Sequence, residues 1–478
     1  CRPPPTDRRG AARLHDEVTR GGHLAVEVGR IEPQPPDGFV HPPQVGDDRT
    51  FDPEDTREIR LYGLGGNDRF IVSGDHRSPI RVRLSGGKDG DTYIDSSTAG
   101  GKRVHIYDLR QGKDSFALNG HDKRRLSSSP AIIRYDRMAF KYDKLMPLAF
   151  AGYNLDDGIL LGLGFQYTKH GWRKEPFAAR HTFVAGHAVA TKAYQFRYQG
   201  EFTDAIGNTD LVLSAYAKAP HNTINFFGLG NQSVYDKSND IWFYRSRYNL
   251  YNAEALLKSK LASKVRLFYG PSFSSYALDK DENDDRFVSK FPQNGLDSVG
   301  VYATKQYLGM KVGIQIDTRD NEILPFRGLL WTTSVFGNQG LNEENRHYLQ
   351  VQSDMSLYTS FRVPANLVLV TRFGGGKIWG HYEFFQAMML GGVQNLRGYR
   401  NNRFAGSAMA YNNVELRLKL FSFKSYLFPA SVGLLAYNDV GRVWLEGEDS
   451  GRWHDGWGGG LYFMPVNMFI ITATLGRS

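Results

Sequence analysis

Apolar and polar residues alternate along most of the chain from about residue 146 onward. In the clearest segment, 308–316, every second residue is Leu, Met, Val or Ile, and Gly, Lys or Gln lies between them. Alternation with a period of two places the apolar side chains on one face of a strand and the others on the opposite face. The predicted β-strands are 146–154, 158–168, 178–187, 193–203, 209–219, 240–256, 262–277, 301–317, 327–337, 346–361, 366–379, 407–420, 431–445, 454–464 and 467–475.

These fifteen strands predict an all-β fold, with one transmembrane antiparallel β-barrel over 140–478. A single strand does not distinguish a membrane barrel from a soluble sandwich, because both have one apolar face. A soluble sandwich of this size would divide into domains, whereas strands of about ten residues follow one another here without a helical interruption. An antiparallel barrel closes with an even number of strands, so a sixteenth strand is expected beyond the last residue of this chain.

The connections between the predicted strands are of two kinds. The longest are 220–239, 278–300 and 380–406, and they fall on the same side when successive strands alternate in direction. Short turns, such as 362–366, fall on the other side. Outer-membrane barrels have long loops outside the cell and short turns in the periplasm. The pattern therefore predicts a barrel in the bacterial outer membrane.

Composition agrees with an all-β chain. Glycine provides 52 of the 478 residues and aromatic residues make up 13%, and helices tolerate glycine poorly. No run of about 18 apolar residues occurs, so no transmembrane helix is predicted. The net charge of +9 is spread over the strands and not gathered in a patch, so no nucleic-acid partner is expected. The single cysteine, Cys1, excludes a disulfide within the chain.

Two segments precede the predicted barrel. Residues 1–56 are rich in Pro and Arg, lack periodicity and are predicted to be disordered or at least not part of a core. Residues 57–135 are predicted to form a small β domain with two copies of one turn, at 63–72 and 85–95. Each copy has paired glycines, then acidic or amide residues, then an aromatic and a β-branched residue.

The two turns resemble the Gly-Gly-x-Gly-x-Asp repeats of calcium-binding parallel β-rolls. Calcium needs several oxygen ligands at about 2.3–2.6 Å, which side chains of these turns could supply. In the first copy an asparagine stands where the repeat has its central glycine, and such turns also form without a metal. A calcium site and a metal-free β domain are therefore both open alternatives. The candidate ligands are Asn67, Asp68, Asp89, Asp91 and Asp95.

A glycine-rich loop at 389–400 contains a central arginine, Arg397, between two apolar strand-like segments. Its glycines allow sharp turns and a close approach of the backbone to other backbone. Taken alone, the loop is compatible with a surface hairpin and with a segment folded into the barrel.

Four motifs together resemble those of the bacterial surface antigen superfamily of outer-membrane barrels, which includes assembly factors of the BamA and TamA type and two-partner secretion transporters. Residues 390–399 are similar to the signature loop of that family, 226–231 to an outer-loop motif, and 437–444 to its Phe-x-Asp-x-Gly strand. All four motifs occur in family order, within about 140–478. The fourth is the turn between strands eight and nine, matched by Asp317, Arg319, Asp320, Pro325 and Gly328.

The resemblance implies a sixteen-stranded barrel with its eleventh connection folded into the lumen. Arg397, followed by Gly398 and Tyr399, would then be held by an acidic residue of the inner wall, and Asp439 is the matching position. A buried carboxylate needs such a partner, and arginine offers a bidentate one. The alternative for Asp439 is a solvated carboxylate in the lumen. Family members usually carry POTRA domains before the barrel, but 1–140 shows no alternating β/α pattern of that kind.

The resemblance also implies a function in the assembly, insertion or translocation of proteins at the outer membrane. The expected partners are outer-membrane lipids, unfolded barrel or secreted proteins as clients, and accessory lipoproteins, with the N-terminal domain in the periplasm. The alternative is a passive channel, or an anchor for the N-terminal domain or for an enzyme outside this sequence. The chain is expected not to be an enzyme, since Gly-x-Ser-x-Gly, His-Glu-x-x-His and P-loop motifs are absent.

Overall fold

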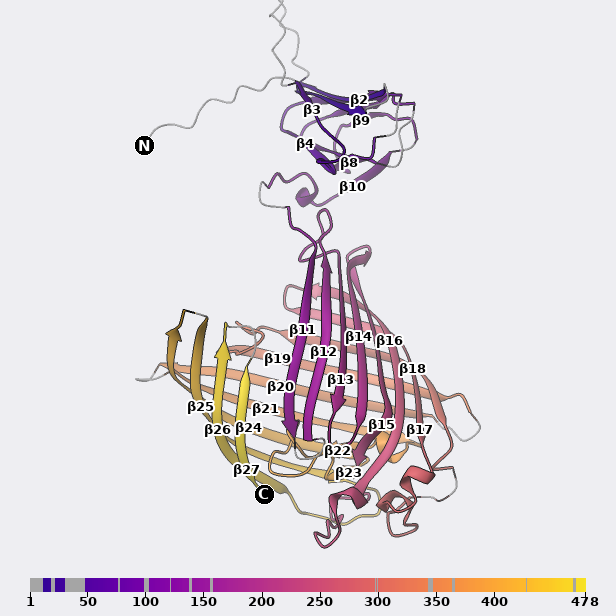
Figure 1. The fold of residues 1–478 in the computed structure, drawn as a ribbon, viewed down its shortest axis with the longest axis vertical. Helices are drawn as coiled ribbons and strands as arrows, with labels where there is room; N and C mark the ends of the chain where they lie inside the picture. The colour runs from indigo at the N-terminus through magenta and orange to yellow at the C-terminus, as the bar shows by residue number, and fades with distance from the viewer. Residues whose placement is uncertain are drawn as a thin grey trace, which may run out of the picture. The chain divides into compact units, whose positions relative to one another are not determined.

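The computed structural model divides into two compact units, unit 1 (Cys1–Lys141) and unit 2 (Tyr142–Ser478). Figure 1 shows the path of the chain through each of them. None of the described helices is long and apolar enough to cross a membrane. The structure describes residues 12–18, 22–30, 48–75, 78–98, 103–120, 122–136, 140–154, 158–296, 298, 300–342, 347–362, 366–426, 428–466 and 470–478.

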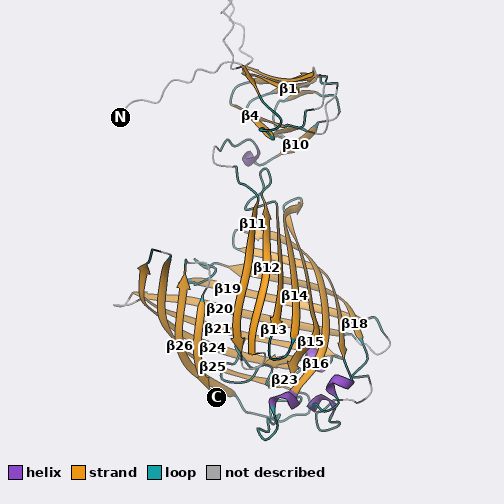
Figure 2. Cartoon of the chain, in the orientation of Figure 1, coloured by secondary structure: helices purple, strands orange, loops and turns teal. Residues whose placement is uncertain are grey.

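In unit 1 the chain alternates between two small sheets (Figure 2). One sheet contains the parallel strands β4, β6, β8 and β10, and the other contains β5, β7 and β9, also parallel, beside β1, β2 and β3. Phe70 stacks on Tyr93 and Tyr93 on Phe116, with ring centroids 5.1 and 5.3 Å apart. This arrangement confirms the predicted β-roll-like domain. Its elements are β1 (Ala12–Val18), β2 (Gly22–Arg30), β3 (Asp48–Thr50), β4 (Glu58–Leu64), β5 (Asp68–Gly74), β6 (Arg81–Gly87), β7 (Thr92–Asp95), β8 (Val104–Leu109), β9 (Ser115–Ala117), β10 (Lys123–Ser127) and the 3-10 helix η1 (Pro130–Ile132).

Strands β1 and β2 lie within 1–56, where the sequence predicts no part of a core. β2 pairs with β5 in antiparallel fashion, with Val26 opposite Val72, and so extends the second sheet of unit 1. The segment 24–28 does alternate between larger apolar residues and others. This pattern is too short to predict a strand within the surrounding proline- and arginine-rich sequence.

Unit 2 is one antiparallel sheet of fifteen strands, each paired with the next strand of the sheet along the chain. It confirms the predicted all-β barrel fold, and each of the fifteen predicted strands is present. Figure 1 shows the sheet curved so that β11 to β14 lie in front of β19 to β21. In the described residues its outermost strands, β11 and β27, do not pair with each other. The strands are β11 (Lys144–Asn154), β12 (Gly158–Lys169), β13 (Ala179–Ala188), β14 (Ala193–Ile206), β15 (Thr209–Asn225), β16 (Arg245–Ala262), β17 (Val265–Leu278), β18 (Lys305–Asp317), β19 (Gly328–Gly340), β20 (Tyr348–Arg362), β21 (Asn366–Gly380), β24 (Ala408–Lys424), β25 (Pro429–Trp444), β26 (His454–Pro465) and β27 (Ile471–Arg477).

The two faces of the sheet differ as the alternation predicts. On β18, Leu308 and Met310 point outward and are each 52% exposed, whereas Tyr307 points inward and is buried. Large apolar side chains are exposed at the equivalent outward positions of the neighbouring strands. An apolar outer band around a more polar inner face is the arrangement of a membrane barrel, in which lipid covers the outer band.

The connections define two ends of the sheet. The long-loop end carries the connections β15–β16, β17–β18, β21–β24 and β25–β26, and the short-turn end carries β14–β15, β16–β17, β18–β19 and β24–β25. Within the β21–β24 connection, β22 (Met388–Leu390) and β23 (Phe404–Gly406) pair as a hairpin. The 3-10 helices at the long-loop end are η2 (Ile241–Tyr244), η3 (Asp281–Asn283), η4 (Phe287–Ser289) and η5 (Phe384–Gln386).

Candidate functional site

The glycine-rich loop lies on the inner face of the sheet. Leu390 and Leu396 are 0% exposed and belong to an apolar cluster with Met409 and Tyr411 of β24 and Val443 of β25. These strand residues occupy inward positions, and the β22–β23 hairpin holds the two ends of the loop together. The loop is therefore folded into the barrel and is not a surface hairpin.

Arg397 of this loop forms a bidentate ion pair with Asp439 of β25. Nε and Nη2 of Arg397 donate to Oδ2 and Oδ1 of Asp439 at 2.7 and 2.8 Å, and the backbone N–H of Arg397 donates to Oδ2 at 2.9 Å. The side chain of Asp439 is 0% exposed. A buried carboxylate costs free energy unless donors surround it, and one residue here supplies three donors.

Two residues that the sequence did not identify as partners of Arg397 complete its surroundings. Nη1 donates to Glu415 of β24, and the other carboxylate oxygen of Glu415 accepts from Nε of Arg417 at 2.6 Å. The guanidinium carbon of Arg397 lies 3.7 Å from the ring centre of Tyr437. The alternation does identify Glu415 and Tyr437 as inward positions. The alternation does not indicate which inward residues face one another.

Glycines bring the loop against the last two strands. Gly398 has a φ of +94°, and a Cβ at this position would lie 2.9 Å from the carbonyl oxygen of Arg477 on β27. A Cβ at Gly456 of β26 would overlap the carbonyl oxygen of Arg397. Both sites therefore accept only glycine without a shift of the backbone. The loop thus contacts the strand at one open edge of the sheet.

A second ion pair supports the loop from β20 and β21. Nε of Arg372 donates to the two carboxylate oxygens of Asp354 at 3.0 and 2.9 Å, and its Nη1 donates to the carbonyl oxygen of Gln394. The hydroxyl group of Tyr411 donates to the same Asp354. Side chains of four strands, β20, β21, β24 and β25, therefore hold the loop in place.

The motif at 226–231 contacts the β22–β23 hairpin that closes this loop, at the long-loop end. Asn231 is 0% exposed, and its carbonyl oxygen lies 3.0 Å from Nε2 of His454 on β26. The His454 ring packs edge-on against Tyr399, with centroids 5.9 Å apart. The N–H of Gly230 donates to the carbonyl oxygen of Ala405 at 2.8 Å. Two motifs separated by more than 150 residues in the sequence are thus neighbours in the structure.

The turn motif forms the β18–β19 connection at the short-turn end. Asp317 accepts hydrogen bonds from the backbone N–H, Nε and Nη2 of Arg319, at 2.8–3.1 Å. Asp320 accepts from two backbone N–H groups later in the connection, at 2.9 and 3.2 Å. Pro325 is buried, and Gly328 has a φ of +112°, which a larger residue adopts only with strain. These residues fix the shape of the connection.

Leu324 links this connection to strands β25 and β26. It is 4% exposed and packs in a cluster with Leu435 and Tyr437 of β25 and with Tyr462 and Met464 of β26. Tyr437 is also the aromatic residue beneath Arg397. Tyr437 therefore belongs both to the apolar cluster of the turn motif and to the surroundings of the signature loop, and the sequence contains no signal for this link.

Most candidate calcium ligands of unit 1 accept hydrogen bonds between successive coils. Asp91 accepts from the backbone N–H groups of Asp68 and Gly87, at 2.8 and 2.6 Å. Asn67 and Asp89 each accept from a backbone N–H of the neighbouring coil, at 3.2 and 2.7 Å. These bonds give the side chains a structural use, so they agree with a metal-free domain as well as with a metal site.

One group of carboxylates in unit 1 is close enough to share a cation or a proton. Oxygens of Asp91, Asp108 and Asp114 lie within 4.8 Å of one another, and Asp95 is not part of this group. Burial raises the pKa of Asp91, and it raises the pKa of Asp108 to about 7. Asp114 opens a third coil, 23 residues after Asp91, and its N-terminal neighbours lack the paired glycines by which the other two turns are recognisable in the sequence. The calcium site stays a prediction.

Comparison with known proteins gives the relationship of unit 2. The Omp85 superfamily domain matches residues 157–464. Among solved structures, the chain is similar to BamA from Haemophilus ducreyi lacking POTRA domains 1–3, with 13% identity and a TM-score of 0.47 over 70% of this chain and 69% of that one. No curated protein matches the sequence.

Two CdiB structures are also similar, from Acinetobacter baumannii and from Escherichia coli. They share 14% and 15% identity with this chain, at TM-scores of 0.43 and 0.45, over 70% of its length. The chain spans 56% and 58% of their lengths.

The matched segment contains all four motifs, from 226–231 to 437–444, and extends from the start of β12 to the end of β26. It confirms the family predicted from these motifs, whose members are outer-membrane β-barrels. Since the family domain covers more than half of the chain, this protein belongs to the Omp85 superfamily.

Proposed function

We propose that the chain acts in the insertion or translocation of proteins at the outer membrane, as a barrel of the BamA/TamA-like type. The observation that carries this proposal is the inward loop fixed by Arg397 between Asp439 and Glu415. A passive diffusion pore has no need for such a loop. Because the loop backbone lies against β26 and β27, the position of the loop and the open edge at β27 are physically connected.

The proposed mechanism of insertion or translocation depends on the unpaired edge strands of the sheet. Strands at the edge of a sheet present unpaired N–H and C=O groups, which are a template for a further strand. In the described residues β11 and β27 are both edges of this kind. A client strand would pair there while the inward loop, anchored to four other strands, keeps the neighbouring wall in register.

The long-loop end faces the outside of the cell in this proposal, and the short-turn end faces the periplasm. β11 begins at the short-turn end, directly after unit 1, and this order supports a periplasmic location for unit 1 in the proposal. The partners are outer-membrane lipids, unfolded barrel proteins or secreted proteins as clients, and accessory lipoproteins. No step requires a catalytic residue or a cofactor of this chain.

Depletion of the protein, followed by quantitative proteomics of the outer membrane, tests the proposal. Barrel proteins or secreted proteins should fall on depletion, and the wild-type chain should restore them. Arg397→Ala should insert into the membrane but fail to restore them. Arg197→Ala is the control, since Arg197 is an inward arginine of β14 that forms no hydrogen bond or ion pair in the described part of the chain. Unchanged client levels on depletion would contradict the proposal.

A passive channel, or an anchor for unit 1, is the second candidate function. The observation in its favour is that unit 1 is a separate compact β-roll with its own core. In this case depletion would leave other barrel proteins unchanged. The barrel without unit 1 would then fail to reverse any defect that depletion causes, whereas the Arg397→Ala chain would reverse it.

A further inference from the structure

Two cationic residues occupy outward positions near the long-loop end. Lys377 of β21 lies two residues before Trp379, which is 45% exposed, and Arg442 of β25 lies two residues before Trp444, which is 38% exposed. Residues two apart on a strand share a face, so both cations lie on the face that lipid covers. A charge on this face costs free energy, most at the bilayer midplane and least near the interface. Their presence therefore calls for a partner.

Aromatic rings accompany both cations. Nζ of Lys377 lies 5.3 Å from the ring centre of Trp379, and the guanidinium carbon of Arg442 lies 4.5 Å from that of Trp444 and 5.7 Å from that of Trp453. Neither cation has an ion pair in the described part of the chain. Nη2 of Arg442 donates to the carbonyl oxygen of Ser450, and Nε of Arg442 has no hydrogen-bond partner among the described residues. The protein thus positions two cations without neutralising them.

The surface between the cations is built from small residues. β24 lies between β21 and β25, and its outward positions here are Ala408, opposite Lys377, and Ala410, opposite Arg442. Neighbouring strands are about 4.8 Å apart, so the two strands that carry the cations lie on the order of 10 Å apart. Alanine leaves this interval open for a bulky group. We call Lys377, Arg442 and the alanines between them the basic outer patch.

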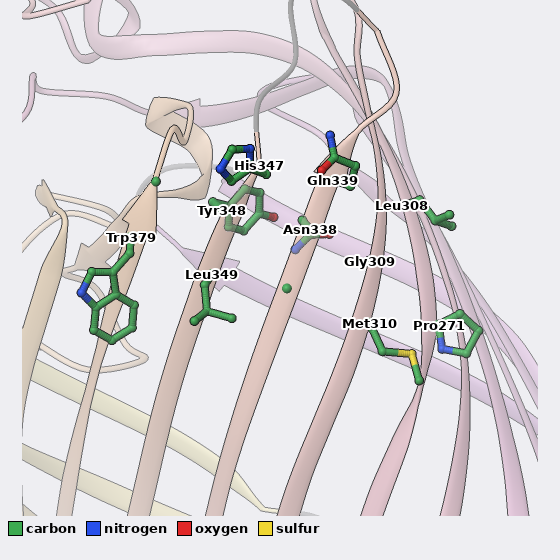
Figure 3. Close-up of a pocket in the computed structure, with 12 residues that line it drawn as sticks. Pro271, Leu308, Gly309, Met310, Asn338, Gln339, His347, Tyr348, Leu349 and Trp379 are labelled. Atoms are coloured by element: carbon green, nitrogen blue, oxygen red, sulfur yellow. The ribbon is translucent and has the colours of Figure 1, made fainter.

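An apolar groove of about 810 Å³ begins beside the patch, with Trp379 as its wall. The outward residues of one cross-strand row are Met310, Gly337, Leu349 and Trp379, and the missing side chain at Gly337 leaves a depression in that row. Figure 3 shows Met310, Leu349 and Trp379 on β18, β20 and β21, with β19 between the first two. These strands are fully paired with each other, so they offer no edge to a peptide. A long apolar chain is the occupant that such a groove fits.

We propose that the basic outer patch binds a bis-phosphorylated, acylated glycolipid of the lipid A type. Lys377 and Arg442 contact one phosphate each, the sugars lie over Ala408 and Ala410, and an acyl chain lies in the groove beside Trp379. Arginine and lysine form strong charge-assisted contacts with phosphate, and tryptophan at a membrane interface suits the junction of headgroup and acyl chain. The proposal rests on the orientation given with the proposed function, in which the long-loop end faces the outside of the cell, and it does not depend on the handling of client proteins.

Native mass spectrometry of the full chain in detergent, with added lipid A, tests this site. Lipid A should bind to the wild type, and Lys377→Gln combined with Arg442→Gln should weaken binding at least tenfold. Monophosphoryl lipid A should bind with an intermediate affinity. Gly337→Leu should weaken binding without removing a charge, because a Cβ there meets only Leu349, at 3.8 Å, and the new side chain enters the groove.

The control variant is Lys169→Gln, at the outward end of β12 on the short-turn side, which should bind lipid A as the wild type does. A heat-dependent shift on electrophoresis verifies that each variant is a folded barrel. Equal binding of phosphatidylcholine would reduce the site to a general apolar surface, and equal binding of cardiolipin would overturn the choice of a glycolipid. Unchanged lipid A binding by the double variant would overturn the site itself.

Discussion

The guanidinium carbon of Arg397 lies 3.7 Å from the ring centre of Tyr437, and the same tyrosine belongs to one apolar cluster with Leu324 of the β18–β19 connection. One family motif thus enters the barrel from the long-loop end, the other from the short-turn end, and both meet at a single inward residue of β25. A cation over an aromatic face contributes about 0.5–2 kcal/mol, depending on how far it is desolvated. Tyr437 therefore links the two motifs energetically as well as spatially.

Tyr437→Ala should loosen both motifs at once. Removing the ring deletes the cation–π contact with Arg397 and leaves a cavity beside Leu324, at a cost of about 3–5 kcal/mol for a large aromatic residue. Hydrogen–deuterium exchange should rise in 389–400 and in 318–327. Tyr437→Phe keeps the ring and should leave exchange in both segments near the wild-type level. Faster exchange in only one segment of the Ala variant would show that Tyr437 does not link them.

Arg397→Lys should behave almost like Arg397→Ala. A lysine has one ammonium group, which cannot reproduce the paired contacts with Asp439 and the further contact with Glu415. Breaking a buried ion pair costs about 3–5 kcal/mol because a charge is left without its partner. Protease sensitivity of the loop and recovery of client proteins measure the effect. If the Lys variant restored client proteins as well as the wild type does, a positive charge without the bidentate geometry would be enough to hold the loop.

The strands of unit 2 follow from the sequence because lipid on one side and a lumen on the other require strict alternation. The ends of the strands follow less well. Pro220 suggests that β15 stops near 219, but a register shift between Lys218 and Asn222 lets pairing resume as far as Asn225. Conversely, β16 begins at Arg245 and not near 240, because Ile241–Tyr244 forms a 3-10 turn capped by Asp240.

The site could be predicted only where a family motif named its residues. Arg397 and Asp439 are 42 residues apart, and the resemblance was the only reason to pair them. Glu415 and Tyr437 are inward positions among many, and their facing partners depend on how the sheet curves. In unit 1, Asp114 lies 23 residues after Asp91, a spacing that would have located it. Its coil, however, lacks the paired glycines that mark the turns at 63–72 and 85–95.

Gly398→Ala should disturb the edge strand β27. An alanine at a φ of +94° is strained, and its Cβ would press on the carbonyl oxygen of Arg477. Gly447→Ala is the comparison, because Gly447 has a φ of +81° but no atom within 4 Å of its Cβ position. Backbone strain of about 1–2 kcal/mol is then common to both variants. Exchange in 471–477 should rise only in Gly398→Ala, and equal effects would assign the change to strain alone.

Chelation of calcium should leave the melting of unit 1 unchanged. Both carboxylate oxygens of Asp91 already accept backbone hydrogen bonds, and those of Asp108 accept from the Tyr93 hydroxyl and from the N–H of Leu109. A cation would have to replace or share these donors. Calorimetry of the full chain in EDTA and in excess calcium measures the effect. A higher melting temperature in calcium would instead support the calcium alternative, with Asp91, Asp108 and Asp114 as its ligands.

The stability of unit 1 should increase as the pH falls from about 8 to about 5. Burial raises the pKa of Asp108 from 3.8 to about 7, so between these values the folded unit keeps a proton that the unfolded chain has lost. The contribution of Asp108 to the free energy of unfolding therefore falls as the pH rises through this window, by at most about 3 kcal/mol. His105 has the opposite sign within this window: burial lowers its pKa from 6.5 to about 4, so its contribution to stability is lost as the pH falls through this range. Glu58 also has the opposite sign, but its pKa is lowered from 4.5, so its stabilisation is lost only below this window. In calorimetry, Asp108→Asn should raise the melting temperature at pH 8 and reduce the pH dependence. The remainder comes from Asp122, whose pKa is also raised to about 7 by burial and by the nearby Asp95. An unchanged pH profile in this variant would assign the titration to another carboxylate.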